Sequence, residues 1–283
     1  MSKNILSIII CFYPDTKHLT LMNESLKKSS NVLIIDNTPE YIDFSDISAE
    51  IILNGENLGI AEAQNIGLRI SLERGYKYSI LFDQDSIVPE NMISNLSIKL
   101  DNIKKTACIG PRVFDLNCSQ KMRSRVMLNH EEENNLTKVS QIIASGKLIN
   151  NSTLSDIGLM ESELFIDAVD HEWCWRAISK GYNIYIDEDT VMSHVLGESS
   201  YNFKLFKLTE NSPTRTYYIL RNYLLLIRRP YVPLYWKLRN FIILPASIFL
   251  SLIFFKGRIK RLGNVCLALR DGVFGKTGKI DGK

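Results

Sequence analysis

Residues 78–86 read YSILFDQDS, an apolar run that ends in two acidic residues. The apolar part carries no charge, which predicts a strand that is covered on both faces of a sheet. Asp83 and Asp85 follow it, and side chains two positions apart in an extended segment point to the same side. Two carboxylates placed in this way can share one Mg²⁺ or Mn²⁺ ion. A solvated turn is the alternative, because D-x-D by itself is a common pattern.

Segments on the N-terminal side of this stretch alternate between strand-like and helix-like patterns. The order predicts an α/β fold with a mostly parallel, right-handed, Rossmann-like sheet flanked by helices. Ligands of such sheets bind at the carboxyl ends of the strands, and all four predicted strand ends are polar. We therefore expect a nucleotide crevice there. The other predicted strands are LSIIICFY (6–13), NVLIIDN (31–37) and AEIILNG (49–55), and the predicted helices cover 17–29, 59–75 and the residues after Pro89.

A second acidic motif, LFIDAVDHEWCWRAISKGY, covers residues 164–182. The pattern predicts a helix with Asp170 at its N-terminus, where a carboxylate is a natural helix cap. The functional alternative makes Asp170 a general base that deprotonates a hydroxyl group. Glu172 is a further candidate for the same site, although helix geometry turns it away from Asp170. We expect Trp173, Ala177 and Ile178 to face inward.

Charge is distributed unevenly along the chain, whose formal net charge is +3. Residues 1–202 carry 18 Lys and Arg against 28 Asp and Glu, a balance of −10, and residues 203–283 carry 16 against 3, a balance of +13. The basic tail contains apolar runs at 217–227 and 241–255. This combination favours amphipathic helices that lie on an anionic membrane surface. A buried helical subdomain, packed on the rest of the chain or on another subunit, is the alternative.

Three further features bear on the class of protein. The apolar run near the N-terminus is short and lacks a small-residue cleavage site, so we expect a buried first strand and no export signal. The five cysteines are scattered without a C-x-x-C pair, which predicts reduced thiols. The polar stretch 117–138 predicts a surface loop. No nucleic-acid recognition module is visible.

Nine motifs occur in one order over nearly the whole chain, and with them the sequence resembles the family 2 glycosyltransferases of the GT-A fold, specifically the bacterial rhamnosyltransferases. The resemblance implies a catalytic domain at 1–202, with a sugar-nucleotide half at about 1–110 and an acceptor half at about 111–202. A helical, membrane-associating tail follows at 203–283. The motifs are FYP (12–14), IIDN (34–37), NxxNxGIAxAxNxG (54–67), LFDQDS (81–86), GPR (110–112), SGxLI (145–149), FIDxVDxEWCxR (165–176), HxLG (194–197) and YYxxRN (217–222).

The resemblance also implies roles for particular residues. Asp170 matches the catalytic base. Asp83 and Asp85 match the metal and diphosphate motif, with Mg²⁺ or Mn²⁺ as the ion, and His194 matches a histidine that approaches the metal. The residues implied to bind the donor nucleotide or to flank the acceptor are Tyr13, Pro14, Asp36, Asn57, Asn65, Asp83, Arg112, Glu172 and Trp173.

The implied reaction is an inverting transfer of L-rhamnose from dTDP-L-rhamnose to a polyprenyl-diphosphate-linked saccharide. It would serve bacterial cell-surface polysaccharide synthesis of the O-antigen type, at the cytoplasmic side of the inner membrane. The same scaffold accommodates a UDP-hexose or UDP-N-acetylhexosamine donor, because a fold does not determine the substrate. A membrane-bound assembly subunit with a degenerate nucleotide fold is the non-enzymatic alternative. Homo-oligomers could form through the tail.

Overall fold

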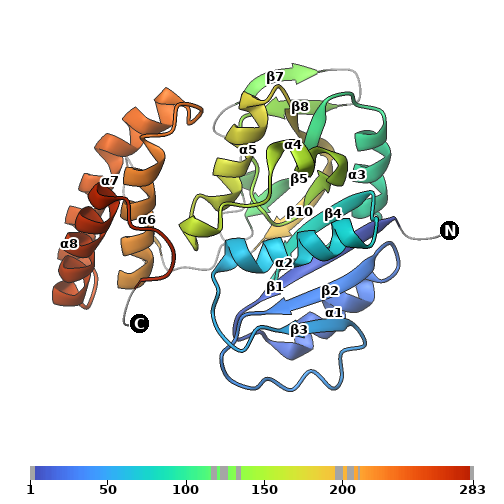
Figure 1. The fold of residues 1–283 in the computed structure, drawn as a ribbon, viewed down its shortest axis with the longest axis horizontal. Coiled ribbons are helices and arrows are strands. Elements are labelled where there is room, and N and C mark those ends of the chain that lie inside the picture. Colours follow the sequence, from blue (N-terminus) through green and yellow to red (C-terminus); the bar gives the residue numbers. More distant parts are fainter. Residues whose placement is uncertain are drawn as a thin grey trace.

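A mixed ten-stranded sheet forms the centre of the computed structural model, which describes residues 4–115, 120–121, 127–131, 135–194, 200–202, 207–209 and 211–280. The strand order is β3-β2-β1-β4-β9-β5-β10-β8-β7, and β6 pairs with β5 (Figure 1). The strands are β1 (Ile5–Cys11), β2 (Asn31–Asp36), β3 (Glu50–Leu53), β4 (Tyr78–Asp83), β5 (Thr106–Asp115), β6 (Gln120–Lys121), β7 (Met127–Glu131), β8 (Leu136–Val139), β9 (Lys147–Asn150) and β10 (Asn183–His194). A separate two-stranded sheet joins β11 (Ser200–Asn202) to β12 (Lys207–Thr209).

Strands β1 to β4 run parallel, as the sequence predicts, and β5 and β10 are parallel to each other. Strand β9 is antiparallel to both of its neighbours, β4 and β5. Strand β8 is antiparallel to β10, and β7 to β8. The α/β fold with a mostly parallel sheet is therefore confirmed. The expectation of a loop throughout 117–138 is wrong in part, because β7 and the first residues of β8 extend the sheet there.

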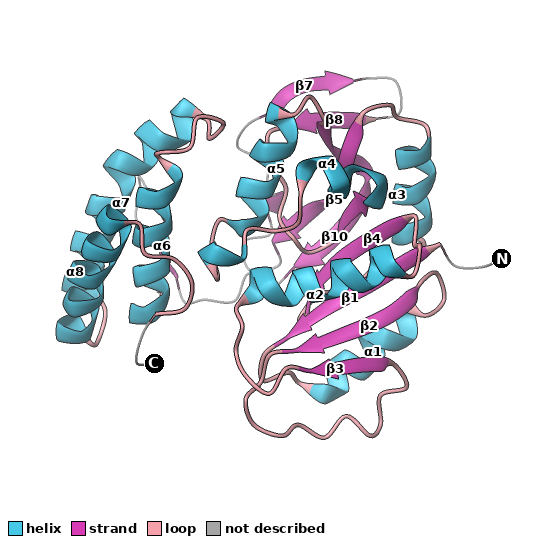
Figure 2. Ribbon diagram, in the orientation of Figure 1, coloured by secondary structure: helices cyan, strands magenta, loops and turns pink. Residues whose placement is uncertain are grey.

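Helices cover both faces of the sheet (Figure 2). Every residue of β1 is buried, and its side chains alternate between the two hydrophobic cores. One core joins the sheet to α2 (Ile60–Glu73) and α5 (Val169–Ser179), and the other joins it to α1 (Thr16–Leu26) and α3 (Met92–Asp101). This two-sided burial explains why the strand carries an uninterrupted apolar run. The short helix α4 (Leu154–Ile157) lies before α5.

Three C-terminal helices pack side by side next to the α5 side of the sheet (Figure 1). They are α6 (Pro213–Leu226), α7 (Leu234–Phe254) and α8 (Arg258–Phe274). Helix α7 begins seven residues before the apolar run 241–255 and has 21 residues. Among the described residues it is the one helix that is long and apolar enough to cross a membrane, and 6% of its most apolar window is buried.

Candidate functional site

The turn after β4 holds the first acidic pair at the carboxyl edge of the parallel strands. The Ser86 hydroxyl is hydrogen-bonded to the Ser145 hydroxyl, which also accepts from the Asp83 backbone N–H over 3.5 Å. Asp83 is half-buried and Asp85 is exposed. The turn is thus anchored through its backbone and Ser86, while the Asp85 carboxylate faces solvent.

A second connection fastens the same turn to the end of β1. The Phe12 N–H donates to Gln84 Oε1 over 2.7 Å, and Gln84 Nε2 donates back to the Phe12 carbonyl over 3.2 Å. This pair of bonds between a backbone and an amide resembles a step of sheet pairing. It explains why a glutamine suits the position between the two aspartates, since a shorter side chain would not span the gap.

Asp170 is the second residue of α5 and is 22% exposed. Its Oδ1 accepts from the His171 N–H over 3.0 Å, and the His171 ring nitrogen lies 3.9 Å from its other oxygen. The cap position is taken by Ala168, and no side chain caps this helix. Asp170 is therefore not the cap residue, but its carboxylate accepts one free N–H of the first turn and is partly exposed to solvent.

The residues that lead into β9 join the two acidic sites. Ser145 contacts the Ser86 turn, and two positions later the Lys147 ammonium donates to the Asp170 carbonyl over 3.2 Å. Gly146 between them has φ +81°, and a Cβ at this position would lie 2.8 Å from the Pro111 ring, so glycine is required. Lys147 is not among the predicted site residues, and it has no exposed surface. A lysine that opens an otherwise apolar strand was the available signal.

Tyr13, Pro14 and Asp36 lie together at the ends of β1 and β2. The Tyr13 N–H donates to the Thr38 hydroxyl over 2.8 Å, and that hydroxyl donates to Asp36 over 2.7 Å. Asp36 is 1% exposed, and its burial raises the pKa of the carboxyl although the Thr38 hydrogen bonds oppose this. The Tyr13 ring is exposed and its hydroxyl donates to Glu40. The prediction that this group binds a nucleotide base stays a prediction, and Tyr13 is its solvent-facing member.

The two predicted asparagines have different surroundings. Asn57 is half-exposed, and its Oδ1 accepts from the Gly59 N–H over 2.9 Å just before α2 begins. Asn65 is buried and exchanges hydrogen bonds of 2.8 and 2.9 Å with the Met160 backbone. In this structure Asn65 therefore ties α2 to the segment before α5 and does not line an open surface, contrary to expectation. Asn57 remains a candidate.

Arg112, in β5, points toward the bulge of β10. Its guanidinium lies 3.4 Å from the Glu188 carboxylate, and a little over a quarter of its side chain is exposed. Glu188 also accepts from the Thr137 hydroxyl over 2.8 Å. The contacts of Arg112 are thus structural ones along the far strands of the sheet, and its donor-binding role stays a prediction.

Glu172 and Trp173 lie inside the protein, contrary to the expectation that they flank the acceptor. Neither has exposed surface. The Glu172 carboxylate accepts two bonds of 2.9 Å from Arg176, and the Trp173 indole donates to the Gly158 carbonyl over 2.9 Å. Helix geometry turns Glu172 away from Asp170, whereas Trp173, three positions after Asp170, lies on a neighbouring part of the same side and is covered by the protein.

Only part of the predicted metal site lies among the residues that the structure describes. The backbone of β10 ends at His194, whose side chain lies outside the described residues. Ser193 forms an antiparallel bridge with Ile87, so this strand end runs toward the Asp85 turn. Among the described side chains, no group of three or more His, Cys, Asp or Glu residues could hold a metal ion. The two carboxylate groups nevertheless fit the oxygen-ligand chemistry of Mg²⁺ or Mn²⁺, which take further ligands from substrate phosphates.

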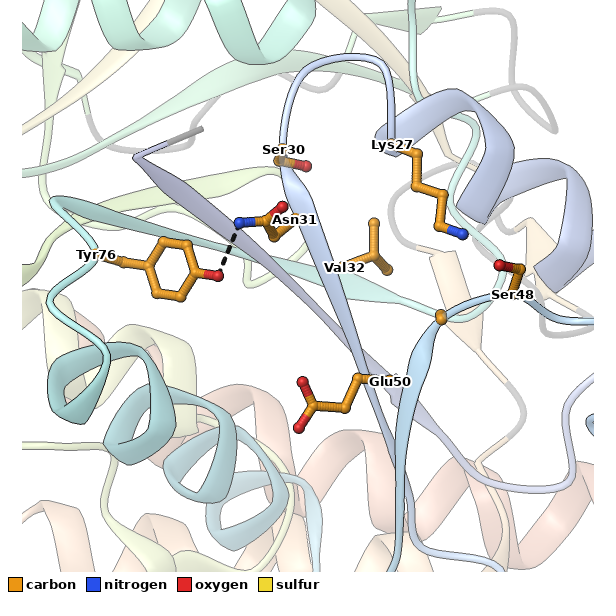
Figure 3. Close-up of a pocket in the computed structure, with 8 residues that line it drawn as sticks. Lys27, Ser30, Asn31, Val32, Ser48, Glu50 and Tyr76 are labelled. Atoms are coloured by element: carbon orange, nitrogen blue, oxygen red, sulfur yellow. Dashed lines mark hydrogen bonds between the residues drawn. The ribbon is translucent and has the colours of Figure 1, made fainter. Parts of the chain in front are cut away.

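An open pocket at the opposite ends of the strands, where β2 and β3 begin, is not part of this site (Figure 3). There Asn31 donates to the Tyr76 hydroxyl over 2.8 Å. Glu50, which also lines it, is held by two hydrogen bonds from Arg74. The Asn31 amide, the Tyr76 hydroxyl and the Glu50 carboxylate are therefore already paired.

Comparison with known proteins identifies the family. No family model matches the chain. A dTDP-rhamnosyl transferase of Shigella flexneri, RfbF, is 33% identical over 291 residues, which cover 98% of each protein. The chain belongs to the family 2 rhamnosyltransferases. It is thus a glycosyltransferase, and the resemblance drawn from the motifs is confirmed.

Solved structures of GT-A glycosyltransferases share the fold of this rhamnosyltransferase. Residues 1–349 of S. aureus TarS in complex with UDP-GlcNAc match 98% of the chain and 82% of that protein, with a TM-score of 0.58 and 14% identity. The mannosyltransferase PcManGT from Pyrobaculum calidifontis, in complex with GDP-Man and Mn²⁺, matches 97% of the chain and 76% of that protein, with a TM-score of 0.55 and 14% identity. At such identity these matches show the fold alone.

Proposed function

We propose that this rhamnosyltransferase transfers L-rhamnose from dTDP-L-rhamnose to a lipid-linked saccharide acceptor, with inversion at the sugar carbon. The observation that carries the proposal is the convergence of two acidic sites on Ser145 and Lys147, two positions apart. The donor follows from the name of the curated relative. A leaving diphosphate and an attacking hydroxyl must lie on opposite sides of one sugar, so two adjacent acidic sites suit a single displacement.

Asp170 serves as the general base in this proposal. An acceptor hydroxyl within hydrogen-bond reach would lose its proton to the partly exposed carboxylate as the oxygen attacks the sugar carbon. The bond from that carbon to the diphosphate oxygen breaks in the same step. One base suffices, and no covalent enzyme nucleophile is needed. Lys147, held on the Asp170 carbonyl, supports the start of the helix and contributes a positive charge nearby.

Asp83 and Asp85 would hold the divalent cation, with His194 as a further candidate ligand. When bound, such an ion acts as a Lewis acid that neutralises the charge of the leaving diphosphate. The exposed Asp85 is the more direct candidate, because the backbone and Ser86 contacts of the turn leave its side chain outward. The mannosyltransferase neighbour, solved with GDP-Man and Mn²⁺, supports the choice of ion.

A donor panel tests the proposal. We expect transfer, or slow hydrolysis, of dTDP-L-rhamnose in the presence of Mn²⁺ or Mg²⁺, with release of dTDP, and much less release from UDP- or GDP-sugars. Chelation with EDTA should abolish the reaction, and Asp85→Ala should need far more Mn²⁺ than the wild type. Faster turnover of a UDP-hexose or UDP-N-acetylhexosamine would refute the rhamnosyl donor and favour the alternative donor class. Absence of binding to every sugar nucleotide would favour an assembly subunit.

The tail, 203–283, offers a surface for the membrane beside the catalytic unit, 1–202. Helix α7 exposes large apolar side chains along its length, and α8 exposes a stripe spaced three and four residues apart on the side opposite its buried face. Lys256, Arg258 and Lys260 are exposed at the turn between the two helices. Apolar side chains flanked by basic ones suit an anionic bilayer surface. The exposed stripe of α8 is Ile259, Leu262, Cys266, Leu269 and Val273.

A charge on the exposed face of α7 should release the protein from membranes. Phe241 and Ile242 are 69% and 72% exposed, and a carboxylate on the apolar face of a helix that lies on a bilayer opposes the burial of that face. We expect Phe241→Asp/Ile242→Asp to reduce binding to vesicles of anionic phospholipid at least about tenfold in a co-sedimentation assay. The matched control, Leu21→Asp/Ile98→Asp, changes equally exposed residues of α1 and α3 and should bind as the wild type does. Unchanged vesicle binding together with loss of a dimer in sedimentation velocity would instead assign this face to a second copy.

A further inference from the structure

The segment that leads into α5 has an unusual backbone. Phe165, Asp167 and Ala168 have φ values of +65°, +67° and +64°. Non-glycine residues seldom adopt this left-handed conformation, and a bulky residue such as phenylalanine does so only when its surroundings impose it. Asp170 follows two residues later. The direction in which α5 begins, and hence the position of the Asp170 carboxylate, depends on this segment.

Asn222 of α6 holds the segment through its backbone. Its Nδ2 lies 3.1, 2.7 and 3.0 Å from the carbonyl oxygens of Leu164, Ile166 and Asp167. The amide is 1% exposed, so water does not compete for these donors. One NH₂ group thus orients three carbonyl groups toward itself. The backbone that carries these carbonyls must turn sharply for all three to reach it.

Arg221 fixes the orientation of that amide and adds further contacts. Its Nε and Nη2 donate to Asn222 Oδ1 over 3.0 and 2.8 Å, which leaves the NH₂ group pointing at the segment. Nη2 also donates to the Leu164 carbonyl over 2.9 Å. The guanidinium has no exposed surface and lies 5.4 and 5.0 Å from the ring centres of Tyr217 and Tyr218. Because the buried Arg221 guanidinium would lose these partners if it moved, they hold it in one orientation.

The other side of the segment is closed by the start of α2. The Ala61 N–H donates to the Phe165 carbonyl over 3.4 Å, and a Cβ on Gly59 would lie 2.7 Å from that oxygen. The Phe165 ring stacks on Tyr218 with 4.9 Å between ring centres and 14° between planes. The strained backbone is therefore held between the nucleotide half of the protein and α6.

We propose that Arg221 and Asn222, in the tail, are positioning residues for catalysis. Their hydrogen bonds hold the segment 164–168, in which Phe165, Asp167 and Ala168 are left-handed, in the conformation that aims α5 and places Asp170 against the acceptor. The proposal rests on the proposed function only in taking Asp170 as the base. It predicts that the tail is needed for the chemical step as well as for any contact with the membrane.

The variant Asn222→Asp tests this directly, because it keeps the acceptor for Arg221 and removes the donors to the three carbonyls. We expect kcat for rhamnosyl transfer to fall about 10- to 100-fold, the range for a small misplacement of a catalytic group. KM for the donor should stay within about twofold of the wild type. Adding Ala168→Gly, which accepts positive φ without strain, should recover kcat several-fold. A residue that only stabilises the fold would give neither the split between kcat and KM nor this recovery.

Asn240→Asp is the matched control, since it makes the same change at an asparagine of α7 that bonds within its own helix. Its kcat should stay within about twofold of the wild type. The inference is overturned if Asn222→Asp keeps wild-type kcat, or if added Ala168→Gly recovers nothing. Absence of transfer by the wild-type protein would instead refute the proposed function, so the two failures are distinguishable.

Arg215→Gln carries the test if Asn222→Asp fails to fold. Arg215 is 44% exposed and its Nε lies 3.2 Å from the Asp167 carboxylate, so its replacement loosens the same segment with little risk to the core. We expect a smaller fall in kcat, about threefold or more, and faster hydrogen exchange of the amides of residues 165–170. Unchanged kcat and unchanged exchange would overturn the inference.

Discussion

Asp170→Asn is expected to lose rhamnosyl transfer about 10²- to 10⁴-fold, the contribution that a general base typically makes. The change keeps the shape of the side chain, and the amide oxygen can still accept from the His171 N–H. The amide cannot take the acceptor proton. Donor binding should persist, because the contacts that anchor the Asp83–Ser86 turn do not involve the Asp170 side chain.

Two measurements separate this role from a structural one. The thermal shift produced by dTDP-L-rhamnose with Mn²⁺ should be the same in Asp170→Asn and in the wild type, since ligand binding stabilises by mass action. Asp101→Asn is the control, because Asp101 pairs with Lys77 at the end of α3 and is about half exposed. Its transfer rate should be unchanged. A fully active Asp170→Asn protein would show that another group takes the proton.

The parallel strands near the N-terminus were predictable because local pattern and tertiary environment agree there. The buried runs of β1, β2 and β4 lie between two layers of helices, so nearly every side chain is apolar and each run ends where the sheet ends. Polar residues such as Asp36 and Asp83 then fall at one edge by topology alone. Nothing beyond periodicity is needed to place them.

Burial along α5 was predictable only in part from the motif that contains it, since Trp173 and Ala177 face inward as expected but the burial of Glu172 was not foreseen. A helix turns about 100° per residue, so Glu172 faces away from Asp170, while Trp173 lies on a neighbouring part of the same side and is buried by what packs there. Which direction leads to solvent depends on α6 and the segment after it, which are 40 or more residues away. A charged residue in a functional motif suggests an open site, whereas Glu172 meets its partners inside the protein.

The role of the YYxxRN motif was beyond sequence-based reasoning for a similar reason. Periodicity marks it as part of an apolar helix and gives no sign of what its Arg221 and Asn222 contact. Outside the motif itself, the partners named for them are main-chain carbonyls, which every residue has, so a sequence pattern cannot detect them. Only the three-dimensional structure shows that these carbonyls belong to the strained segment before Asp170.

Replacement of Glu172 by alanine is expected to cause a large loss of stability. Its carboxylate accepts from Arg176, from Arg229 over 3.3 Å and from the Tyr231 hydroxyl over 2.6 Å. Burial, together with the hydrogen bond to Glu172, raises the pKa of Tyr231 to about 12, so the hydroxyl remains a donor at neutral pH. Glu172→Ala leaves two partly buried guanidinium groups without this partner. Removing one member of a buried ion pair costs about 3–5 kcal/mol.

The free energy of unfolding, measured by denaturant titration with tryptophan fluorescence, checks this expectation. Two of the three tryptophans report on the contact that Glu172 holds together, because Trp175 of α5 and Trp236 of α7 lie 5.0 Å apart between ring centres. Glu24→Ala, on the exposed face of α1, is the control and should change the free energy by less than about 0.5 kcal/mol. If Glu172→Ala were as stable as Glu24→Ala, the carboxylate would not join α5 to the tail. If the Glu172→Ala protein lost stability but kept the donor affinity of the wild type when folded, the role of Glu172 would be the structural one that its burial indicates.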